Sequence, residues 1–332
     1  MSVLQAKLLL DPGSDSLRFL PEGPYPLDGE SFDGESFDGE SFSWVAIQHG
    51  PTSTVGSVNI YNFKTGTNRS YQLPGRPGFA FPTNLGNFVV GCERSVGIFK
   101  LGDLSWHPFI EGVDLEISGT IINDGLVWDG NLIFGTKDLE FKTKKAGLYL
   151  WRRSDRKLIQ LRNDQICSNG KVVLPRDDGA VDLLDIDSPT RKVVAYRLDI
   201  EKGQIDSGRV AIDLANQIGV PDGMTMTLDG KSLIISLYNP DAAAYGRTIQ
   251  VGLASGAIEC EWQTAHSPQA TCPQWVSKDG QLALIITTAV EHMPVERRTD
   301  SYNAGSLYCW QTDQPYSISN LRKLLPIFNE LG

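Results

Sequence analysis

Four polar residues occupy the same position in a sequence unit that repeats along the chain, and each is followed directly or after one residue by glycine. They are Glu22, Asn123, Asn169 and Asp222. Two carboxylates and two amides that converge on one point would offer only oxygen ligands, which Ca²⁺, Mg²⁺ and Mn²⁺ prefer. Zinc fits such a site less well, because it usually binds histidine or thiolate as well. Asn-Gly and Asp-Gly pairs also form ordinary turns, so each position alone is weak evidence. Four in phase favour a divalent-metal site.

The stretch around Asp222 shows the unit that carries these residues. Pro221 before the aspartate and Gly223 after it restrict the backbone, so we expect residues 219–224 to form a tight turn that aims the carboxylate in one direction. Two short apolar strands separated by a hairpin turn at Asp229-Gly230 follow.

Units of this kind recur along the whole chain. They begin near Glu22, Gly78, Asn123, Asn169, Asp222 and Cys272, at intervals of about 45 to 56 residues, and each is followed by a further pair of strands. Four strands per period, six times, predict an all-β protein: a six-bladed β-propeller of four-stranded blades, a single domain over residues 1–332, with a strand at residues 3–10 closing the last blade. Two β-sandwiches would fit the density of turns but not six units in phase. In a propeller the innermost strands line the central channel, so the four polar residues would meet on its axis.

Residues 28–42 depart from this period because the pentad Asp-Gly-Glu-Ser-Phe occurs there three times in succession. We interpret this acidic repeat as an insertion in a hairpin of the first blade, either an inert solvated loop or a lid near Glu22. A calcium-binding loop would need alternating oxygen ligands and a terminal glutamate, which this spacing lacks.

The bulk composition limits the partners. A formal net charge of −10 argues against nucleic acid and anionic membranes, which require a basic surface. No secretory signal is recognisable, no apolar run approaches the roughly 20 residues that span a bilayer, and the five cysteines form no CxxC pair. We therefore expect a cytoplasmic protein with no nucleic-acid or membrane partner, acting on a small molecule as a monomer or small homo-oligomer.

Other catalytic motifs are lacking in the sequence. It contains no GxSxG, P-loop, GxGxxG or HExxH motif, and its four histidines are spread singly. His292 follows a predicted inner strand and could face the channel, although a surface position is the simpler interpretation.

Five short motifs in order resemble the senescence-marker-protein (regucalcin), gluconolactonase and luciferin-regenerating-enzyme family. They read Glu22-Gly23-Pro24, Asn123-Asp124-Gly125 with Phe134-Gly135-Thr136, Ser168-Asn169-Gly170 with Asp187-Ser188-Pro189-Thr190-Arg191, Pro221-Asp222-Gly223-Met224, and Thr287-Thr288-Ala289. The resemblance covers nearly the whole chain. It implies a six-bladed propeller with one divalent cation, calcium in the first place and Mg, Mn or Zn as alternatives, bound by Glu22, Asn169 and Asp222.

The reaction that the resemblance implies is hydrolysis of a sugar lactone. The metal would act as a Lewis acid on the lactone carbonyl and acidify a water, while Asp222 takes the proton of that water. Asn123 would contact the substrate or a metal-bound water, and Glu140 matches a position that contacts sugar hydroxyls in the family.

Two departures from the family pattern concern the substrate. Ile121 stands where sugar-lactone members often carry arginine, and Trp128-Asp129-Gly130 replaces the usual Asp-Pro-x-Gly hairpin; a more apolar lactone or ester would suit both. Three nearby lysines could supply the missing cation, although a solvated basic loop is the simpler interpretation. They are Lys137, Lys142 and Lys144.

Alternative functions on the same scaffold stay open. One is a non-catalytic propeller in which the divalent metal is a structural pin, that is, an ion that only holds the blades together at the channel. Another is hydrolysis of a different ester or of an organophosphate. Metal-free condensation, as in strictosidine-synthase-like propellers, does not need Glu22, Asn169 and Asp222 together.

Overall fold

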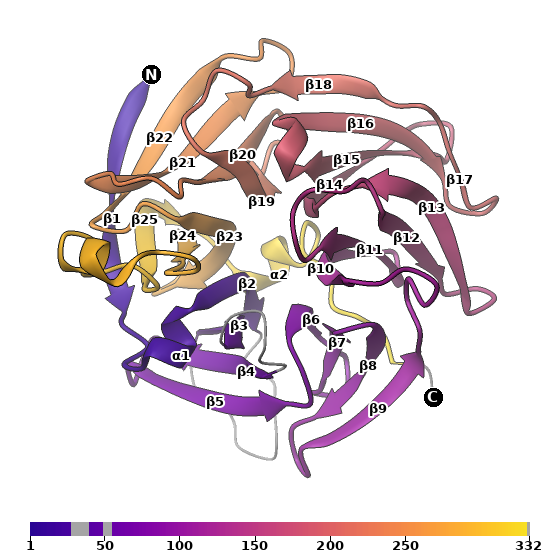
Figure 1. The fold of residues 1–332 in the computed structure, drawn as a ribbon, viewed down its shortest axis with the longest axis horizontal. Coiled ribbons are helices and arrows are strands. Elements are labelled where there is room, and N and C mark those ends of the chain that lie inside the picture. The colour runs from indigo at the N-terminus through magenta and orange to yellow at the C-terminus, as the bar shows by residue number, and fades with distance from the viewer. Residues whose placement is uncertain (28–39, 49–54, 331–332) are drawn as a thin grey trace.

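The computed structural model describes residues 1–27, 40–48 and 55–330, and strands make up nearly all of its regular structure (Figure 1). Residues 28–39, which hold most of the repeated pentads, lie outside the described residues, so the loop and lid interpretations are not tested. The predicted insertion at 28–42 is nevertheless too long, because Ser41 and Phe42 already belong to β3 (Ser41–Gln48). Strand burial follows the position in a sheet: β11 (Asn131–Asp138) is buried along its whole length, whereas β5 (Thr67–Leu73) at a sheet edge is mostly exposed. Central strands are buried along their length because packed neighbours cover both of their faces.

Four sheets are separate from one another, and in each the strands follow the order of the sequence. The first contains β2 (Leu20–Leu27), β3 (Ser41–Gln48), β4 (Val55–Asn62) and β5; the second contains β6 (Pro77–Pro82), β7 (Phe88–Cys92), β8 (Ser95–Lys100) and β9 (Ser105–Ile110). The third contains β10 (Thr120–Trp128), β11, β12 (Ala146–Arg152) and β13 (Lys157–Gln165). The fourth contains β14 (Ser168–Pro175), β15 (Val181–Asp187), β16 (Lys192–Asp199) and β17 (Gln204–Ile205), and β18 (Arg209–Asp213) also pairs with β16.

The fifth sheet has eight strands and joins the end of the chain to its beginning. Its order is β19 (Val220–Met226), β20 (Ser232–Tyr238), β21 (Tyr245–Gly252), β22 (Ile258–Ala265), β1 (Ser2–Leu10), β25 (Leu307–Pro315), β24 (Gln281–Thr288) and β23 (Ala270–Lys278). Within it β1 pairs antiparallel with β25 and parallel with β22. The N-terminal strand thus lies beside the last strand of the chain.

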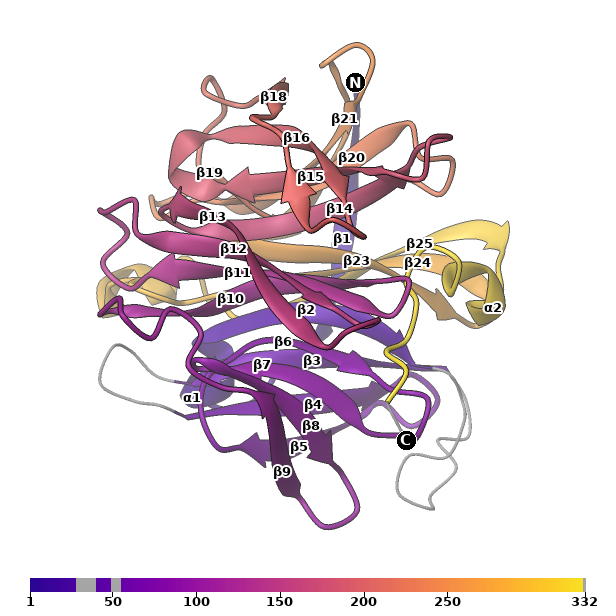
Figure 2. The same ribbon diagram turned by 90° about the vertical axis from the view of Figure 1, so that its right-hand side faces the viewer.

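Helices are short and lie between these strands. They are α1 (Asp15–Arg18), α2 (Ile318–Leu321) and the 3₁₀ turns η1 (Ser188–Thr190) and η2 (Val295–Thr299). In the side view α1 and α2 lie at opposite faces of the molecule (Figure 2). Across the described residues no helix is long and apolar enough to cross a membrane. The all-β propeller with four-stranded blades is confirmed.

The strands β2, β6, β10, β14, β19 and β23 lie around the centre, and each packs against the next until β23 meets β2 again (Figure 1). The pairing register of every one of them shifts once, as in a β-bulge. The shifts occur at 22–25, 77–79, 122–124, 168–171, 221–224 and 270–273, which contain the six starting points of the sequence repeat. A bulge re-aims the side chain that it carries, so the repeat marks where side chains turn into the channel.

This corrects the prediction of a tight turn at residues 219–224. The turn residues there belong to β19, and Asp222 lies in the irregular part of the strand rather than in a loop. Proline is tolerated at such an irregularity because the ladder is already interrupted. The hairpin turn at Asp229-Gly230 is present as expected, with Gly230 at φ +69°.

Neighbouring inner strands approach so closely that only glycine fits at three of the bulges, at Gly78, Gly170 and Gly223. A Cβ on Gly223 would lie 2.7 Å from the Cα of Cys272, and a Cβ on Gly170 would lie 2.5 Å from the backbone nitrogen of Met224. Both clashes are with backbone atoms, which cannot swing aside. Gly170 and Gly223 therefore bring the bulges of β14, β19 and β23 into direct contact and place Asn169 beside Asp222.

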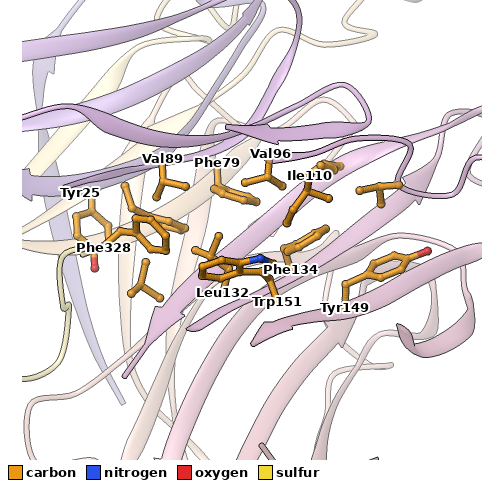
Figure 3. Close-up of a cluster of buried hydrophobic side chains, with 14 of the residues drawn as sticks. Tyr25, Phe79, Val89, Val96, Ile110, Leu132, Phe134, Tyr149, Trp151 and Phe328 are labelled. Atoms are coloured by element: carbon orange, nitrogen blue, oxygen red, sulfur yellow. The ribbon is translucent and has the colours of Figure 1, made fainter. Parts of the chain in front are cut away.

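Aromatic side chains fill the space between the second and third sheets (Figure 3). Phe79 and Phe134 have ring centroids 6.0 Å apart, and Phe328 from the C-terminal segment packs against Trp151 at 5.7 Å. Phe328 is held in place because Thr83 forms an isolated bridge with it. The C-terminal segment thereby fastens two neighbouring sheets together. All five cysteines are free thiols.

Candidate functional site

A cavity of about 240 Å³ lies at the channel where the bulged strands meet. Its polar lining consists of Glu22, Asn123, Lys137, Asn169, Ser188, Asp222 and Glu291, and its other lining residues are Leu20, Phe141, Cys167, Pro189, Val220 and Tyr238. The structure thus brings together all four polar residues that the repeat singled out. They come from four different inner strands, β2, β10, β14 and β19.

Hydrogen bonds fix the two amides in this cavity. Asn169 donates through Nδ2 to Asp222 Oδ1 and to Ser188 Oγ, the latter at 3.2 Å. Asn123 donates through Nδ2 to the backbone oxygen of Ser168 at 2.9 Å. Because the amino groups carry these bonds, the carbonyl oxygens of both amides are the atoms left to face a ligand.

Burial makes the two carboxylates difficult to ionise together. Burial, followed by the charge of Asp222, holds the pKa of Glu22 well above its usual range. Burial raises the pKa of Asp222 to about 8, although Lys137 opposes the shift. Such a pair is stabilised in its ionised form by a cation, and its oxygens together with the Asn169 carbonyl suit a hard divalent ion.

The charges on the lining agree with this interpretation. Three carboxylates, from Glu22, Asp222 and Glu291, face one ammonium, from Lys137, so the formal charge of the lining is minus two. One divalent cation would balance it. In the described part of the chain no group of three His, Cys, Asp or Glu side chains is placed to hold a metal ion. The candidate ligands in this cavity are two carboxylates, from Glu22 and Asp222, and the amide oxygen of Asn169 supplies the third.

A buried ion pair fixes the main chain at Asn169. Lys171 donates to the backbone oxygen of Asn169 at 2.5 Å and lies 3.3 Å from Asp185, and both side chains are at most 1% exposed. Ser168 and Gln165 donate to the same Asp185 carboxylate. This network fixes the bulge of β14 and hence the direction of the Asn169 side chain.

We expect Lys171→Met to lower the free energy of unfolding by about 3 to 5 kcal/mol, because it leaves the Asp185 carboxylate buried without its cation. Lys202→Met is the matched control: Lys202 pairs with Asp199, but its side chain is 68% exposed. It should change stability by less than about 0.5 kcal/mol. Urea unfolding of both variants is the measurement, and equal midpoints would contradict a supporting role for Lys171.

Glu140 is not brought to the cavity. It lies just after β11, in a turn organised by the Asp138 carboxylate, which accepts the backbone N–H groups of Glu140, Lys142 and Thr143. That turn carries Glu140 into solvent, where its side chain is 72% exposed and lies 3.7 Å from Lys142. A contact between Glu140 and a ligand in this cavity is therefore unsupported in this conformation.

Two lining residues, Lys137 and Glu291, were not among the site residues predicted from the sequence. Lys137 was interpreted as part of a solvated loop, but it is only 5% exposed and lines the cavity, whereas Lys142 and Lys144 are exposed. His292 is 66% exposed, in agreement with the surface position expected for it, and its neighbour Glu291 lines the cavity. The position of Lys137 one residue before the end of a fully buried strand was the available signal.

Ile121 and Trp128 do not line the candidate site. Ile121 is buried and stands opposite Lys137 in the register of β10 and β11. Trp128 lines a separate cavity of about 80 Å³, which the C-terminal residues Leu324, Leu325 and Pro326 also line. The two departures that favoured an apolar substrate thus lie outside the cavity that holds the polar residues.

Comparisons with known proteins agree with this geometry. The chain is 30% identical over 256 residues to an uncharacterised protein of Sulfolobus acidocaldarius, covering 75% of this chain and 88% of that one. It is 27% identical over 184 residues to the Bacillus subtilis protein named "Putative sugar lactone lactonase YvrE", covering 55% of this chain and 59% of that one. The fold is similar to that of a calcium-binding protein, regucalcin, from Agrobacterium tumefaciens, with a TM-score of 0.75 and 17% identity over 96% of this chain and 98% of that chain.

A sequence model of the family described as "SMP-30/Gluconolactonase/LRE-like region" matches residues 33–290. That range contains Asn123, Asn169 and Asp222 and more than three quarters of the chain. The chain belongs to the SMP-30/gluconolactonase/LRE-like family.

Proposed function

We propose that this protein hydrolyses a lactone, in the first place a sugar lactone, with the help of one divalent cation. The observation that supports the proposal most directly is the convergence of Glu22, Asn169 and Asp222, from three different inner strands, on one buried cavity. The family contains lactonases by name, and the Bacillus relative is named for a sugar lactone.

We also propose that the ring has six blades. The eight-stranded sheet divides where β1 pairs in parallel with β22, giving β19–β22 on one side and β23, β24, β25 and β1 on the other. Counted in this way, each blade has one bulged strand at the channel. The bulges rather than the sheets then define the repeat.

The donor set fits a hard cation, and calcium is the first choice, with magnesium, manganese or zinc as alternatives. When bound, the cation would polarise the lactone carbonyl and acidify a water. Asp222, ionised beside a cation, accepts a proton from the attacking water. Asn123 holds the substrate through its carbonyl oxygen, and the apolar side of the cavity limits the access of bulk water.

A non-catalytic metal-binding propeller is the second candidate. Glu22, Asn169 and Asp222 would equally well pin three blades together around a cation, and the similar regucalcin structure is described as a calcium-binding protein. A cytoplasmic location and a monomeric or small oligomeric state stay predictions.

Metal analysis of the purified protein together with a pH-stat screen of five- and six-membered sugar lactones tests the proposal. We expect one equivalent of a divalent metal and lactone turnover that a chelator abolishes. Turnover unaffected by complete metal removal would overturn the metal dependence. Tight metal binding with no turnover of any lactone or ester in the screen would favour the structural pin.

A further inference from the structure

Lys137 is a buried cation that faces the candidate cavity. It lies in β11, and its side chain passes over the ring of Phe141, with Nζ 5.4 Å from the ring centroid. Within the described residues its ammonium makes no hydrogen bond, and no carboxylate oxygen lies within 4.0 Å of it. An ammonium has three donors, and burying it without partners is costly. A ligand in the cavity is the partner that the fold leaves open to it.

Glu291 is the complementary group on the opposite wall. Its backbone oxygen accepts hydrogen bonds from Tyr238 Oη at 2.8 Å and from Gln269 Nε2 at 3.0 Å, which fix the main chain at this point. Its carboxylate is 16% exposed and lies 3.8 Å from the exposed His292, and it accepts no hydrogen bond from the described residues. The main chain is thus fixed while the carboxylate is left free for a ligand.

The two groups come from blades that face each other across the ring. Lys137 belongs to the sheet that begins with β10, and Glu291 follows β24, the neighbour of β23. In the ring of inner strands β10 and β23 stand three places apart. A ligand in the cavity therefore meets a donor on one side and an acceptor on the other, with Asp222 and Glu22 between them.

We propose that Lys137 and Glu291 are substrate-binding residues that select lactones carrying free hydroxyl groups, Lys137 donating to one hydroxyl oxygen and Glu291 accepting from another hydroxyl. The inference rests on the proposed lactone hydrolysis and names the residues that would recognise the hydroxyl groups of its substrate. Apolar lactones would leave the buried Lys137 ammonium without an acceptor and the Glu291 carboxylate without a hydrogen-bond donor. Acidic lactones would suit Lys137 but would be repelled by Glu291, which is not one of the proposed metal ligands.

The test compares substrates with and without hydroxyl groups. For the calcium-loaded protein we measure kcat/KM for a 1,5-aldonolactone and for δ-valerolactone, which has the same ring and no hydroxyls. Lys137→Met removes the donor, and Glu291→Gln replaces a charged acceptor by a weaker neutral one; each should reduce the ratio of the two values at least about tenfold, mainly through KM for the aldonolactone. Lys137→Gln, which keeps a donor, should recover part of the ratio.

The exposed pair Lys142 and Glu140 supplies matched controls, because it has the same side chains close to the cavity but outside it. Lys142→Met and Glu140→Gln should leave the ratio within about twofold. An equal fall in these controls, or an unchanged ratio in Lys137→Met and Glu291→Gln, overturns the proposal. A fall in the ratio for Glu140→Gln alone would assign the hydroxyl contact to Glu140 and would also overturn the proposal.

A binding measurement separates this inference from the proposed function. A 1,5-anhydroalditol has the hydroxylated ring but no ester, so calorimetric titration with it does not depend on turnover. If the wild-type protein hydrolyses no lactone but binds the anhydroalditol, and Lys137→Met or Glu291→Gln weakens binding at least about tenfold, the inference holds and the proposed reaction fails. No binding by the wild-type protein overturns the inference whatever the protein hydrolyses. Circular dichroism melting of each variant confirms that it is folded.

Discussion

Asp222→Asn should lower kcat for lactone hydrolysis by roughly 10³-fold while the protein stays folded, because the variant loses the proposed general base and one ligand of the cation. The asparagine keeps the shape of the side chain, and it removes a carboxylate whose burial already raises its pKa to about 8. Stability without metal should therefore stay the same or increase, since a costly buried charge is gone. Steady-state kinetics and thermal unfolding of the same preparation measure both effects.

Asp229→Asn is the matched control on the same hairpin. Asp229 lies in the turn between β19 and β20, and its side chain is 58% exposed. Its substitution should leave kcat unchanged. Glu22→Gln should reproduce the loss seen for Asp222→Asn, and a double variant of Glu22 and Asp222 that still turns over the lactone would rule out the proposed metal-assisted mechanism.

The fold could be predicted because the repeat consists of signals that are local in the sequence. Turn residues, short apolar runs and glycine-containing hairpins recur at a nearly constant interval, and the unit starts at Glu22, Gly78 and Asp222 all fall at bulges. What the sequence could not show is that these residues belong to strands. A bulge and a turn share the same residue types, Asn, Asp, Gly and Pro, and only the pairing partner distinguishes them.

The site could be predicted only where a residue type recurs in phase. Asn123 and Asn169 were found in this way, whereas Lys137 was not, because a lysine near the end of a strand usually extends into solvent. The direction of Lys137 depends on where β11 ends, and the hydrogen bonds that Asp138 accepts from the following turn set that end. The same turn carries Glu140 into solvent, so the sugar contact that the resemblance implies for Glu140 stays a prediction.

Saturating calcium should raise the melting temperature of the metal-free protein, and by more at pH 8 than at pH 5. Glu22 and Asp222 both have folded-state pKa values above those of an unfolded chain, and that of Asp222 is about 8. Their protonated forms are therefore favoured by folding. This contribution is fully present below about pH 4 and is lost as the pH rises toward 8.

The cation reverses that loss because it binds the ionised carboxylates. At pH 5 it must displace protons from the site, whereas at pH 8 Asp222 has begun to lose its proton. At a free concentration 100 times the dissociation constant the gain is about 2.7 kcal/mol. Scanning calorimetry at the two pH values, with chelator-treated protein as the reference, measures it. Asp222→Asn should abolish most of the shift and Asp229→Asn should keep it; an equal shift in both variants would place the cation elsewhere in the molecule.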